Sequence, residues 1–447
     1  MSNDGEITVG IDIGTGSVKA IAADADGNVV ARSRVPHALQ IPQPDQMQHD
    51  ADEAWRRGPR AALEQLGDVR PRAVSVAAMV PSLTAVDADG IPRAPGLLYG
   101  DARGRTAEAG AGVNPAESGE LLAFLRWLRD AYPGATGFWP AQSVANHALS
   151  GEAVLDTSTA STAYPLFDWV GWDEQLAKDL GITTDQLPRL VPTAWECGRV
   201  DGDDGPVLAS GCIDALAEQI VAGADEDGDV MVILGTTLIV WSVTTSEQAP
   251  AGHYAIPHTT PGKMLVGGPS NAGGLFVNWA TGWLRESSEP ASPGAVPVWA
   301  PYPRGERVPY DDHTLRGALG RLDLTHDAAA LRRAAFEASG FVARRMIDAT
   351  ARDTGTSPRR IIATGGGTRV DEWVQALADC TGLPVDCVAV PEGGALGSAY
   401  LARMAVGLET NMADAGRWAR TGRRVEPDPA WAGAVAARYD EFLALSP

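Results

Sequence analysis

Two segments of the 447-residue chain follow the same local pattern, and this repeat limits the folds that the chain can adopt. Residues 7–23 and residues 230–243 each contain two apolar runs separated by a short polar turn. The turns are Gly14-Thr15-Gly16-Ser17 and Gly235-Thr236-Thr237. Apolar runs on either side of such a turn predict β-hairpins. The repeat is short, but a duplicated fold would place the two hairpin turns facing each other across a cleft.

The length of the chain indicates two large domains, with three as the alternative, because a single hydrophobic core rarely grows beyond about 300 residues. Hydrophobic residues form 45% of the chain and charged residues 21%, which is typical of a folded globular protein rather than a disordered one. The acidic, turn-rich segment at residues 224–229 lies just before the second hairpin and indicates a boundary. We therefore expect one domain at residues 1–226 and a second at residues 227–447.

The formal net charge is −21, and no run of Lys and Arg interrupts it. A field of this sign repels nucleic acid and anionic lipid, so neither is an expected partner. The four cysteines form no Cys-x-x-Cys pair and the histidines no His-Glu-x-x-His pattern, which argues against a disulfide framework or a zinc site. Residues 1–6 lack the basic and apolar regions of a secretion signal, and no apolar run is long enough for a membrane span. We expect a cytoplasmic protein.

Both extended and helical patterns occur along the chain. Besides the two hairpins, strands are expected at residues 29–35, 73–78, 83–86 and 360–364. Helices are expected at residues 52–66, 118–131, 142–149, 212–222, 327–352 and 370–380, and a last helix from residue 393 to beyond residue 404. On this pattern the middle third of the chain is mostly helical.

The first hairpin turn carries groups that suit a phosphate. Gly14, Thr15 and Ser17 present backbone N–H groups and hydroxyls in one concave place, and such nests bind phosphate oxygens. Asp12 lies at the end of the preceding strand, where it can hold Mg²⁺ directly or through water, and Lys19 adds a positive charge. The alternative is a glycine-rich hairpin with a capping aspartate and no ligand.

Two further turns are candidates for a nucleotide site. Gly235-Thr236-Thr237 resembles the first turn, and together the two suggest a nucleotide whose phosphates lie between the domains. Gly365-Gly366-Gly367 follows a buried-strand pattern, and glycine allows a close approach of the backbone to a flat ring or a phosphate. The triple glycine is neither a Walker sequence nor a Gly-x-Gly-x-x-Gly fingerprint. The alternative for it is a helix-start turn.

An acid at a helix start and a cluster of three side chains are candidates for the acceptor side. Asp214 follows a Ser-Gly turn, and the helix dipole favours its ionised form, which can accept the proton of an attacking hydroxyl. Tyr99, Asp101 and Arg103 combine an aromatic ring, an acceptor and a donor, so the pair Asp101 and Arg103 can grip a polyhydroxylated molecule. The alternatives are an ordinary helix acid at position 214 and a surface salt bridge between positions 101 and 103.

The order of these motifs resembles the FGGY family of carbohydrate kinases over nearly the whole chain, and most of all its xylulokinase and gluconokinase branches. The matching segments, in chain order, are residues 11–15, 78–79 with 87–90, 99–103, 211–214, 235–237, 301–307 with 316–317, 365–367 with Trp373, and 392–397. The resemblance implies an α/β fold of two actin-like, ribonuclease H-like domains. Each domain would have a mixed five-stranded sheet, and a cleft would separate them.

The resemblance also implies an enzyme that uses ATP and Mg²⁺ to phosphorylate a hydroxyl of a small sugar or polyol, with a ketopentose such as xylulose favoured. It implies that Asp214 is the catalytic base and that Asp12 and Asp214 serve the metal. The implied sugar-binding residues are Met79, Tyr99, Asp101, Arg103 and Asp214. The implied ATP-binding residues are Gly14, Thr15, Ser17, Lys19, Gly235, Thr236, Thr237, Gly365, Gly366 and Gly367, and residues 392–397 are implied to lie at the adenosine-binding end. The sequence does not decide the oligomeric state, for which a homodimer is one candidate.

Several positions depart from the family pattern on the acceptor side. Val80-Pro81 occupies the place where xylulokinases carry the histidine of a Met-His pair, Tyr99 replaces a usual Trp, Val370 replaces a frequent Asn, and residues 110–117 form a shortened linker. An aldonate such as gluconate, or a tetritol, therefore stays open as the acceptor. A non-catalytic nucleotide-dependent sugar sensor or scaffold is the alternative from another class. The retention of all the acidic candidates and of Arg103 argues against it.

Overall fold

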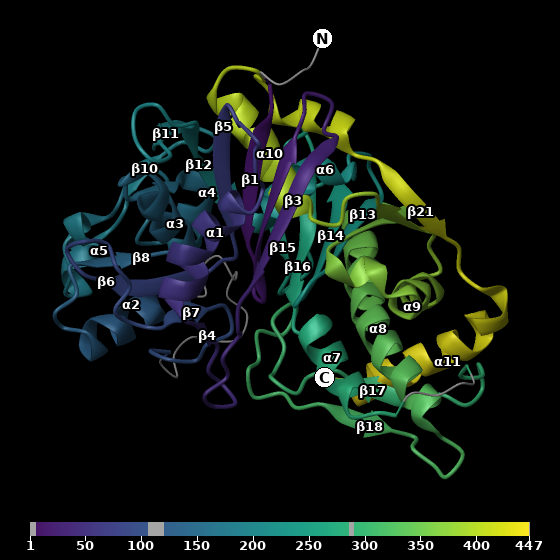
Figure 1. Ribbon diagram of the computed structural model, residues 1–447. Helices are drawn as coiled ribbons and strands as arrows, with labels where there is room; N and C mark the ends of the chain where they lie inside the picture. The colour runs from purple at the N-terminus through teal and green to yellow at the C-terminus, as the bar shows by residue number, and fades with distance from the viewer. Residues whose placement is uncertain (1–5, 106–119, 286–289, 447) are drawn as a thin grey trace. The chain divides into compact units, whose positions relative to one another are not determined.

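The computed structural model describes residues 6–105, 120–285 and 290–446. The chain divides into two compact units (Figure 1). Unit 1 consists of Met1–Val221 together with Glu392–Trp418, and unit 2 consists of Ala222–Pro391 together with Ala419–Pro447. The segment Glu392–Trp418 therefore packs with the N-terminal half of the chain, which a single boundary near residue 226 does not anticipate.

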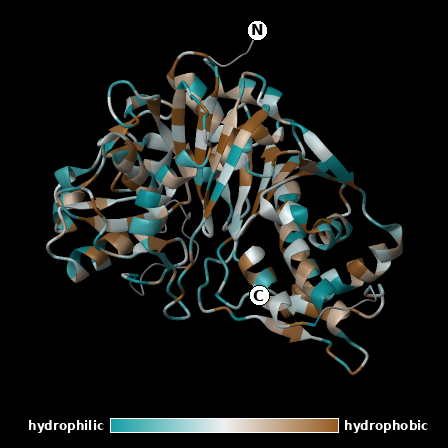
Figure 2. Cartoon of the chain, viewed as in Figure 1, coloured by the Kyte–Doolittle hydropathy of each residue, from teal (hydrophilic) through white to brown (hydrophobic). Residues whose placement is uncertain are grey.

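The main sheet of unit 1 has six strands in the order β11-β12-β5-β1-β2-β3. Strands β1, β2 and β3 form an antiparallel meander, whereas β5 runs parallel to both β1 and β12. The bounds are β1 Thr8–Ile13, β2 Ser17–Ala23, β3 Val29–Pro36, β5 Ala73–Ala78, β11 Glu196–Arg199 and β12 Val207–Ile213. Strand β3 alternates half-buried and exposed residues, and Figure 2 shows hydrophilic residues recurring along it, as expected for a strand at the edge of a sheet.

Helices cover both faces of this sheet. Because side chains alternate along a strand, Thr8, Gly10 and Asp12 lie on the same face of β1. Helix α10 (Gly393–Ala405) packs on that face, where the Thr8 hydroxyl donates to the Ala399 carbonyl at 2.8 Å. The π-helical segment η1 and helices α1 and α3 lie on the other face, and α6 follows β12. Their bounds are η1 Asp52–Arg57, α1 Gly58–Glu64, α3 Ala141–Ser150 and α6 Asp214–Ala222.

A smaller sheet of unit 1, in the order β4-β7-β6-β8, carries the Tyr99–Arg103 segment directly after β7. Its apolar face packs against helix α2, whose residues Phe124, Leu125 and Leu128 are fully buried. The bounds are β4 Gln48–His49, β6 Ser82–Val86, β7 Gly96–Leu98, β8 Gly137–Trp139 and α2 Glu120–Ala131. The remaining elements of unit 1 are β9 Val154–Asp156, β10 Arg189–Val191, α4 Thr157–Ala160, α5 Glu174–Asp179, and the 3₁₀ turns η3 Ser161–Ala163, η4 Thr184–Gln186 and η6 Met412–Trp418.

Unit 2 repeats the arrangement of unit 1 around a seven-stranded sheet in the order β15-β16-β14-β13-β19-β20-β21. Its five inner strands have the same order and directions as β3-β2-β1-β5-β12. The strands are β13 Asp229–Leu234, β14 Leu238–Thr244, β15 Tyr254–Pro257, β16 Met264–Ser270, β19 Arg360–Thr364, β20 Val385–Val388 and β21 Thr421–Val425, with a separate pair β17 Val298–Ala300 and β18 Ala318–Gly320. The helices are α7 Gly274–Gly282, α8 Ala328–Thr354, α9 Asp371–Thr381 and α11 Pro429–Leu445, and η5 is Gly366–Arg369.

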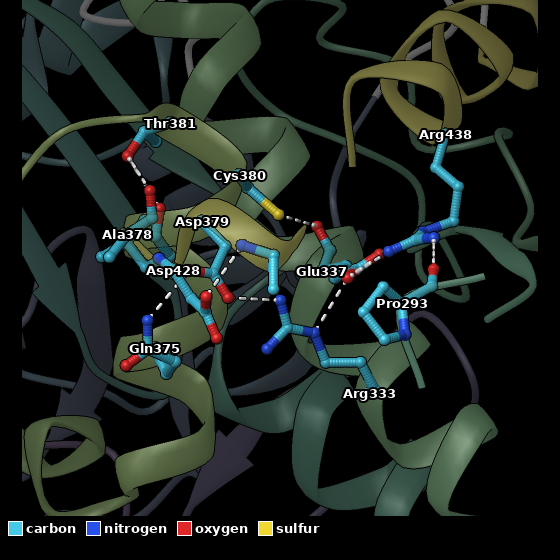
Figure 3. A network of polar contacts seen from close by, with 12 residues as sticks. Pro293, Arg333, Glu337, Gln375, Ala378, Asp379, Cys380, Thr381, Asp428 and Arg438 are labelled. Carbon is cyan, nitrogen blue, oxygen red and sulfur yellow. Dashed lines mark hydrogen bonds and ion pairs between the residues drawn. The ribbon is translucent and has the colours of Figure 1, made fainter. Parts of the chain in front are cut away.

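A buried ionic network fixes three helices of unit 2 to one another (Figure 3). Glu337 of α8 accepts from Arg333 at 2.8 Å and from Arg438 of α11 at 2.6 Å. Arg333 also donates to Asp379 of α9 at 2.7 Å, and Asp379 accepts the Asp428 amide at the start of α11. Buried charges are tolerated when each has several partners, so the network sets the relative positions of α8, α9 and α11.

The sequence-based expectations hold for the long elements and fail at several others. The helix expected from residue 212 begins at Asp214, because Cys212 and Ile213 are still paired with β5. The sheets have six and seven strands instead of five, because β11, β15 and β21 extend the five-stranded cores. The middle third is not mostly helical, since β9 to β16 lie in it. The helix that begins at residue 393 was expected to be the last one, but α11 follows it. The expected helix cap at position 118 and the shortened linker at residues 110–117 lie outside the described residues.

Across residues 6–105, 120–285 and 290–446, no helix has the length and apolar character needed to cross a membrane. All four cysteines are free and buried.

Candidate active site

The first hairpin turn joins β1 to β2 and is held in shape by its own backbone. The Gly14 amide donates to the Ser17 carbonyl at 3.2 Å, and the Gly16 carbonyl accepts the His37 amide at 3.3 Å. Thr15 and Ser17 are buried. A Cβ placed on Gly16 meets nothing within 4 Å, so the tip of the turn borders open space. This tip leaves room for a ligand close to the backbone.

Asp12 and Lys19 face each other across the hairpin. They are direct register partners, and Lys19 Nζ donates to Asp12 Oδ2 at 2.8 Å. The negative charge of Asp12 raises the pKa of Lys19 above its usual value, with smaller contributions from Glu218 and Glu392, although burial opposes the shift. Gly394, in the first turn of α10, lies so close that a Cβ there would be 3.0 Å from Asp12 Cγ. The Asp12 carboxylate therefore lies between a lysine and the start of a helix.

Asp214 is the first residue of α6, at the end of β12, and its side chain remains partly exposed. Its Oδ1 accepts the Ala215 amide at 2.7 Å. Desolvation by the surrounding protein, followed by the charge of Asp12, raises the pKa of Asp214 to about 7, whereas Lys19 acts in the opposite direction. Asp12, Lys19 and Asp214 thus influence one another electrostatically.

A buried polar network supports the strand that carries Asp214. The Gln142 amide donates to the carbonyls of Val76 and Cys212, each at 3.2 Å. The Ile213 amide donates to the Ser158 hydroxyl at 3.3 Å, and this hydroxyl donates to Asp156 at 2.8 Å. The sequence analysis did not single out these residues. Asp156 before Thr157 carries only an N-cap signal, and nothing in the local sequence indicates its link to Ile213.

Asp101 is buried and the Arg103 side chain is only 10% exposed, so the interpretation of the pair as a surface salt bridge is wrong. Asp101 is 0% exposed; it accepts the Met47 amide at 2.7 Å and two Arg103 guanidinium N–H groups, the shorter contact at 2.6 Å. The Arg103 guanidinium also lies 4.7 Å from the centre of the Trp127 ring. Asp101 consequently orients Arg103 and the backbone.

Two other predicted acceptor residues are also internal. Tyr99 Oη lies 2.5 Å from Thr15 Oγ1, so the tyrosine contacts the hairpin turn. Met79 is 2% exposed, and its amide donates to the Ile13 carbonyl at 3.3 Å. In this structure Met79 packs next to the end of β1.

The turns that the sequence analysis singled out in unit 2 lie next to each other. Gly235-Thr236-Thr237 joins β13 to β14, and its first two carbonyls accept the Gly274 and Leu275 amides of α7 at 2.8 and 2.9 Å. Gly365 has a φ of 87°, and a Cβ there would lie 2.9 Å from the Leu234 carbonyl, directly before Gly235.

The triple glycine has one open position and one crowded one. A Cβ on Gly366 meets nothing within 4 Å, whereas a Cβ on Gly367 would lie 2.5 Å from the Trp373 ring. Gly367 is therefore required for packing, and Gly366 is the position where the backbone borders open space. Residues 392–397, implied to lie at the adenosine-binding end, begin α10 in unit 1.

Asp12 and Asp214 suit Mg²⁺ by the chemistry of their donor atoms. Among the described residues no group of three or more His, Cys, Asp or Glu side chains could hold a metal ion. Mg²⁺ keeps several waters and commonly binds through one or two carboxylates and the phosphates of a substrate. The carboxylates of Asp12 and Asp214, which repel each other, therefore fit the role of the protein ligands of one Mg²⁺ ion.

Models of both halves of one enzyme family match the chain. The N-terminal domain of the FGGY family of carbohydrate kinases matches residues 7–204, and its C-terminal domain matches residues 230–406. The chain belongs to the FGGY family. It is accordingly a carbohydrate kinase, a phosphotransferase that acts on an alcohol, with the two-domain actin-like fold of FGGY sugar kinases.

FGGY relatives with different named activities resemble the chain to a similar degree. A glycerol kinase of Dechloromonas aromatica is 29% identical over 475 residues, covering 95% of this chain and 94% of its own length. A gluconokinase of Bacillus licheniformis is 25% identical, covering 89% and 87%. The crystal structure of xylulose kinase from Rhodospirillum rubrum superposes with a TM-score of 0.77 at 25% identity, covering 98% of each chain. These likenesses do not distinguish one acceptor from another.

Proposed function

We propose that this kinase transfers the γ-phosphoryl group of ATP to a hydroxyl of a small sugar or polyol, with Asp214 as the general base. The observation that carries the proposal is the environment of Asp214. Its carboxylate is partly exposed at a helix start, and its pKa is raised to about 7, near the optimum for a base that works at neutral pH. An aspartate with an ordinary pKa would be a weaker base for an alcohol.

The proposed reaction is a direct transfer. Asp214 accepts the proton of the acceptor hydroxyl while that oxygen forms a bond to the γ-phosphorus of ATP. The bond from the γ-phosphorus to the bridging oxygen breaks, and ADP leaves with the electron pair. Lys19 and the Thr15 and Gly16 amides of the first turn would stabilise phosphate charge, and Gly235-Thr236-Thr237 is the second turn proposed to bind phosphate oxygens. Adenosine binds near Gly366.

Mg²⁺ is the metal that we propose for this reaction. Asp12 and Asp214 would hold it, with waters and ATP oxygens as the other ligands. When bound, the ion neutralises phosphate charge. Lys19 would hold the Asp12 carboxylate in position, because its ammonium group lies 2.8 Å from Asp12 Oδ2.

The Tyr99–Arg103 segment supports a sugar or polyol as the acceptor, because it offers a guanidinium group that Asp101 holds in place. A ketopentose such as xylulose is favoured, with gluconate, tetritols and glycerol as the competing acceptors. An ADP-release screen over ketoses, aldonates and polyols decides among them. The true acceptor should give a kcat/KM at least about tenfold above the others.

The four free, buried cysteines support a cytoplasmic location, since thiols persist in a reducing compartment.

The role of Asp214 is tested with Asp214→Asn, which removes the base at nearly constant shape. We expect turnover to fall by roughly 10²–10⁴-fold, with the affinity for metal-free ADP changed less than about threefold. Asp185→Asn, an exposed change in the same unit, is the matched control. Near-normal turnover in Asp214→Asn with the best acceptor would show that another group takes the proton.

A further inference from the structure

Thr15, at the tip of the first hairpin, is bonded from two sides by residues of the smaller sheet. Its Oγ1 lies 2.5 Å from Tyr99 Oη, and its carbonyl lies 2.8 Å from His49 Nε2. Thr15 is 8% exposed, Tyr99 7% and His49 0%, so both contacts are shielded from water. A shielded hydrogen bond has no water to replace it when it breaks, and it therefore restrains the turn more strongly than an exposed one.

The contact between His49 and Trp55 determines which atom donates in the hydrogen bond between His49 and Thr15. Trp55 Nε1 lies 3.0 Å from His49 Nδ1, and an indole N–H can only donate. Nδ1 is therefore the acceptor, and Nε2 carries the proton that is donated to the Thr15 carbonyl. Desolvation, followed by the charge of His37, lowers the pKa of His49 to about 4, so the ring is neutral at physiological pH. One tautomer and one orientation are thus fixed by burial.

The strand that carries His49 is bonded to the acceptor segment. Strand β4 pairs with β7, with His49 opposite Gly96. The amide of Met47 donates to Asp101 at 2.7 Å, and the Ala102 amide donates to the Asp45 carbonyl at 2.8 Å. The smaller sheet therefore links Asp101, which binds the Arg103 guanidinium group, to His49, which binds the Thr15 carbonyl.

We propose that Tyr99 and His49 are positioning residues that couple occupancy of the acceptor site to the geometry of the phosphate-binding hairpin turn. The inference rests on the proposed function. An acceptor held by the Tyr99–Arg103 segment stabilises the positions of both residues, and these in turn hold Thr15 in the arrangement that receives ATP. A tryptophan, the usual family residue at position 99, has no hydroxyl, so this bond to Thr15 depends on the tyrosine of this chain.

The proposal has a measurable thermodynamic consequence. If the acceptor stabilises the turn, it tightens nucleotide binding, and the nucleotide must tighten acceptor binding by the same factor. Loss of one buried hydrogen bond corresponds to a change of roughly fivefold in an equilibrium constant. We expect Tyr99→Phe, which removes a single oxygen atom, to lower the coupling factor by about that amount.

The experiment measures binding of a non-hydrolysable ATP analogue with Mg²⁺ by calorimetry, with and without the acceptor that gives the highest turnover in the screen. Wild type should bind the analogue at least roughly fivefold more tightly with the acceptor, and Tyr99→Phe should lose most of this ratio. Tyr439→Phe is the matched control, because it removes a tyrosine hydroxyl that lies 3.2 Å from Asp348 in unit 2. An undiminished ratio in Tyr99→Phe overturns the proposal.

A second measurement needs no acceptor. Hydrogen exchange of a peptide covering residues 12–19 in the ligand-free protein should be roughly fivefold faster in Tyr99→Phe than in wild type or Tyr439→Phe. His49→Gln keeps a donor near Nε2 and should exchange like wild type, whereas His49→Leu should exchange faster. Unchanged exchange in Tyr99→Phe and His49→Leu contradicts the coupling. Absence of turnover with every acceptor would count against the proposed function, while the exchange rates still decide whether the two residues hold Thr15.

Discussion

At the scale of single residues, the proposed chemistry rests on two carboxylates in different surroundings, Asp12 and Asp214. Lys19 forms an ion pair with Asp12, whereas desolvation and the charge of Asp12 raise the pKa of Asp214 to about 7. Asp214 is therefore largely protonated at pH 6 and largely ionised at pH 8. The two acids thereby take different roles through their surroundings alone.

The pH dependence of catalysis follows from this pKa. We expect kcat/KM for MgATP, at saturating acceptor, to rise about tenfold per pH unit well below pH 7 and to level off above it, because this parameter reports the enzyme before Mg²⁺ and nucleotide bind. The reason is that only the ionised Asp214 can accept a proton. Initial rates between pH 5.5 and 9 provide the measurement. A profile that is flat from pH 6 to 8 would contradict the assignment of Asp214 as the base.

Stability should depend on the same ionisation in the opposite sense. The folded pKa of about 7 lies above the ordinary value of 3.8, so the folded chain holds the proton more tightly than the unfolded chain. Wild-type stability is consequently lost as the pH rises from about 4 to 7, by up to about 4 kcal/mol. Asparagine does not ionise, so Asp214→Asn does not lose this stability as the pH rises. Its advantage in urea unfolding should grow by about 3 kcal/mol from pH 5 to pH 8, and an advantage independent of pH would refute the raised pKa of Asp214.

The sequence singles out Asp12, Lys19 and Asp214 as candidate site residues, because each lies in or next to a turn or helix start with a recognisable motif. The supports of the site could not be expected in this way. Tyr99 and Thr15 are 84 positions apart, and His49 and Thr15 are 34 apart, so only the three-dimensional fold brings them together. The burial of Asp101 was equally hidden, since a local Asp-x-Arg pair has the same sequence at the surface and in a core.

At the scale of elements, the site depends on how closely α10 approaches β1 and α6. A Cβ on Gly10 of β1 would lie 1.9 Å from the Ala395 carbonyl of α10, and a Cβ on Gly397 would lie 1.8 Å from the Ala217 carbonyl of α6. These glycines allow backbone to pack against backbone. The same approach brings Gly394 against Asp12.

Gly10→Ala should therefore displace α10 and disturb Asp12. We expect a loss of stability of at least about 2–3 kcal/mol, because the added methyl group meets a backbone carbonyl that cannot rotate away. Turnover should fall as well. Urea unfolding and steady-state rates test both effects. Gly433→Ala, at an exposed position of α11 with nothing within 4 Å, should instead change stability by less than about 1 kcal/mol. Equal effects of the two variants would rule out the packing argument.

Elements with a long, regular pattern were predicted near their observed bounds, and short or ambiguous ones were not. Helix α8, expected at residues 327–352, spans Ala328–Thr354 with Asp327 as its cap. Cys212 and Ile213 are apolar residues between a strand and a helix, so their hydrophobicity fits both, and pairing with β5 decides for the strand. Strands β8, β9 and β10 have three residues each, too few for an alternating pattern to appear.

At the scale of the whole molecule, the chain leaves unit 1 at residue 221, returns to it at residue 392 and leaves it again after residue 418. The returning segment supplies α10, whose residues Ala395, Ala399 and Tyr400 are fully buried. The sequence contains no signal for this return, because α10 has the composition of any buried helix. A boundary can be read from an acidic turn, but the partner of a distant helix depends on tertiary packing.

This division into units predicts which fragments of the chain unfold cooperatively. A fragment of residues 1–226 should not unfold cooperatively, because the β1 face that holds Thr8, Gly10 and Asp12 would lose α10 and expose apolar surface. The same fragment joined to residues 392–418 by a Gly/Ser linker of roughly 15 residues, which spans about 20 Å, should regain a cooperative transition. Circular dichroism during urea titration distinguishes the two. As a control, the linked fragment with Gly10→Ala should be less stable. Cooperative unfolding of the 1–226 fragment alone would show that α10 is dispensable for the core of unit 1.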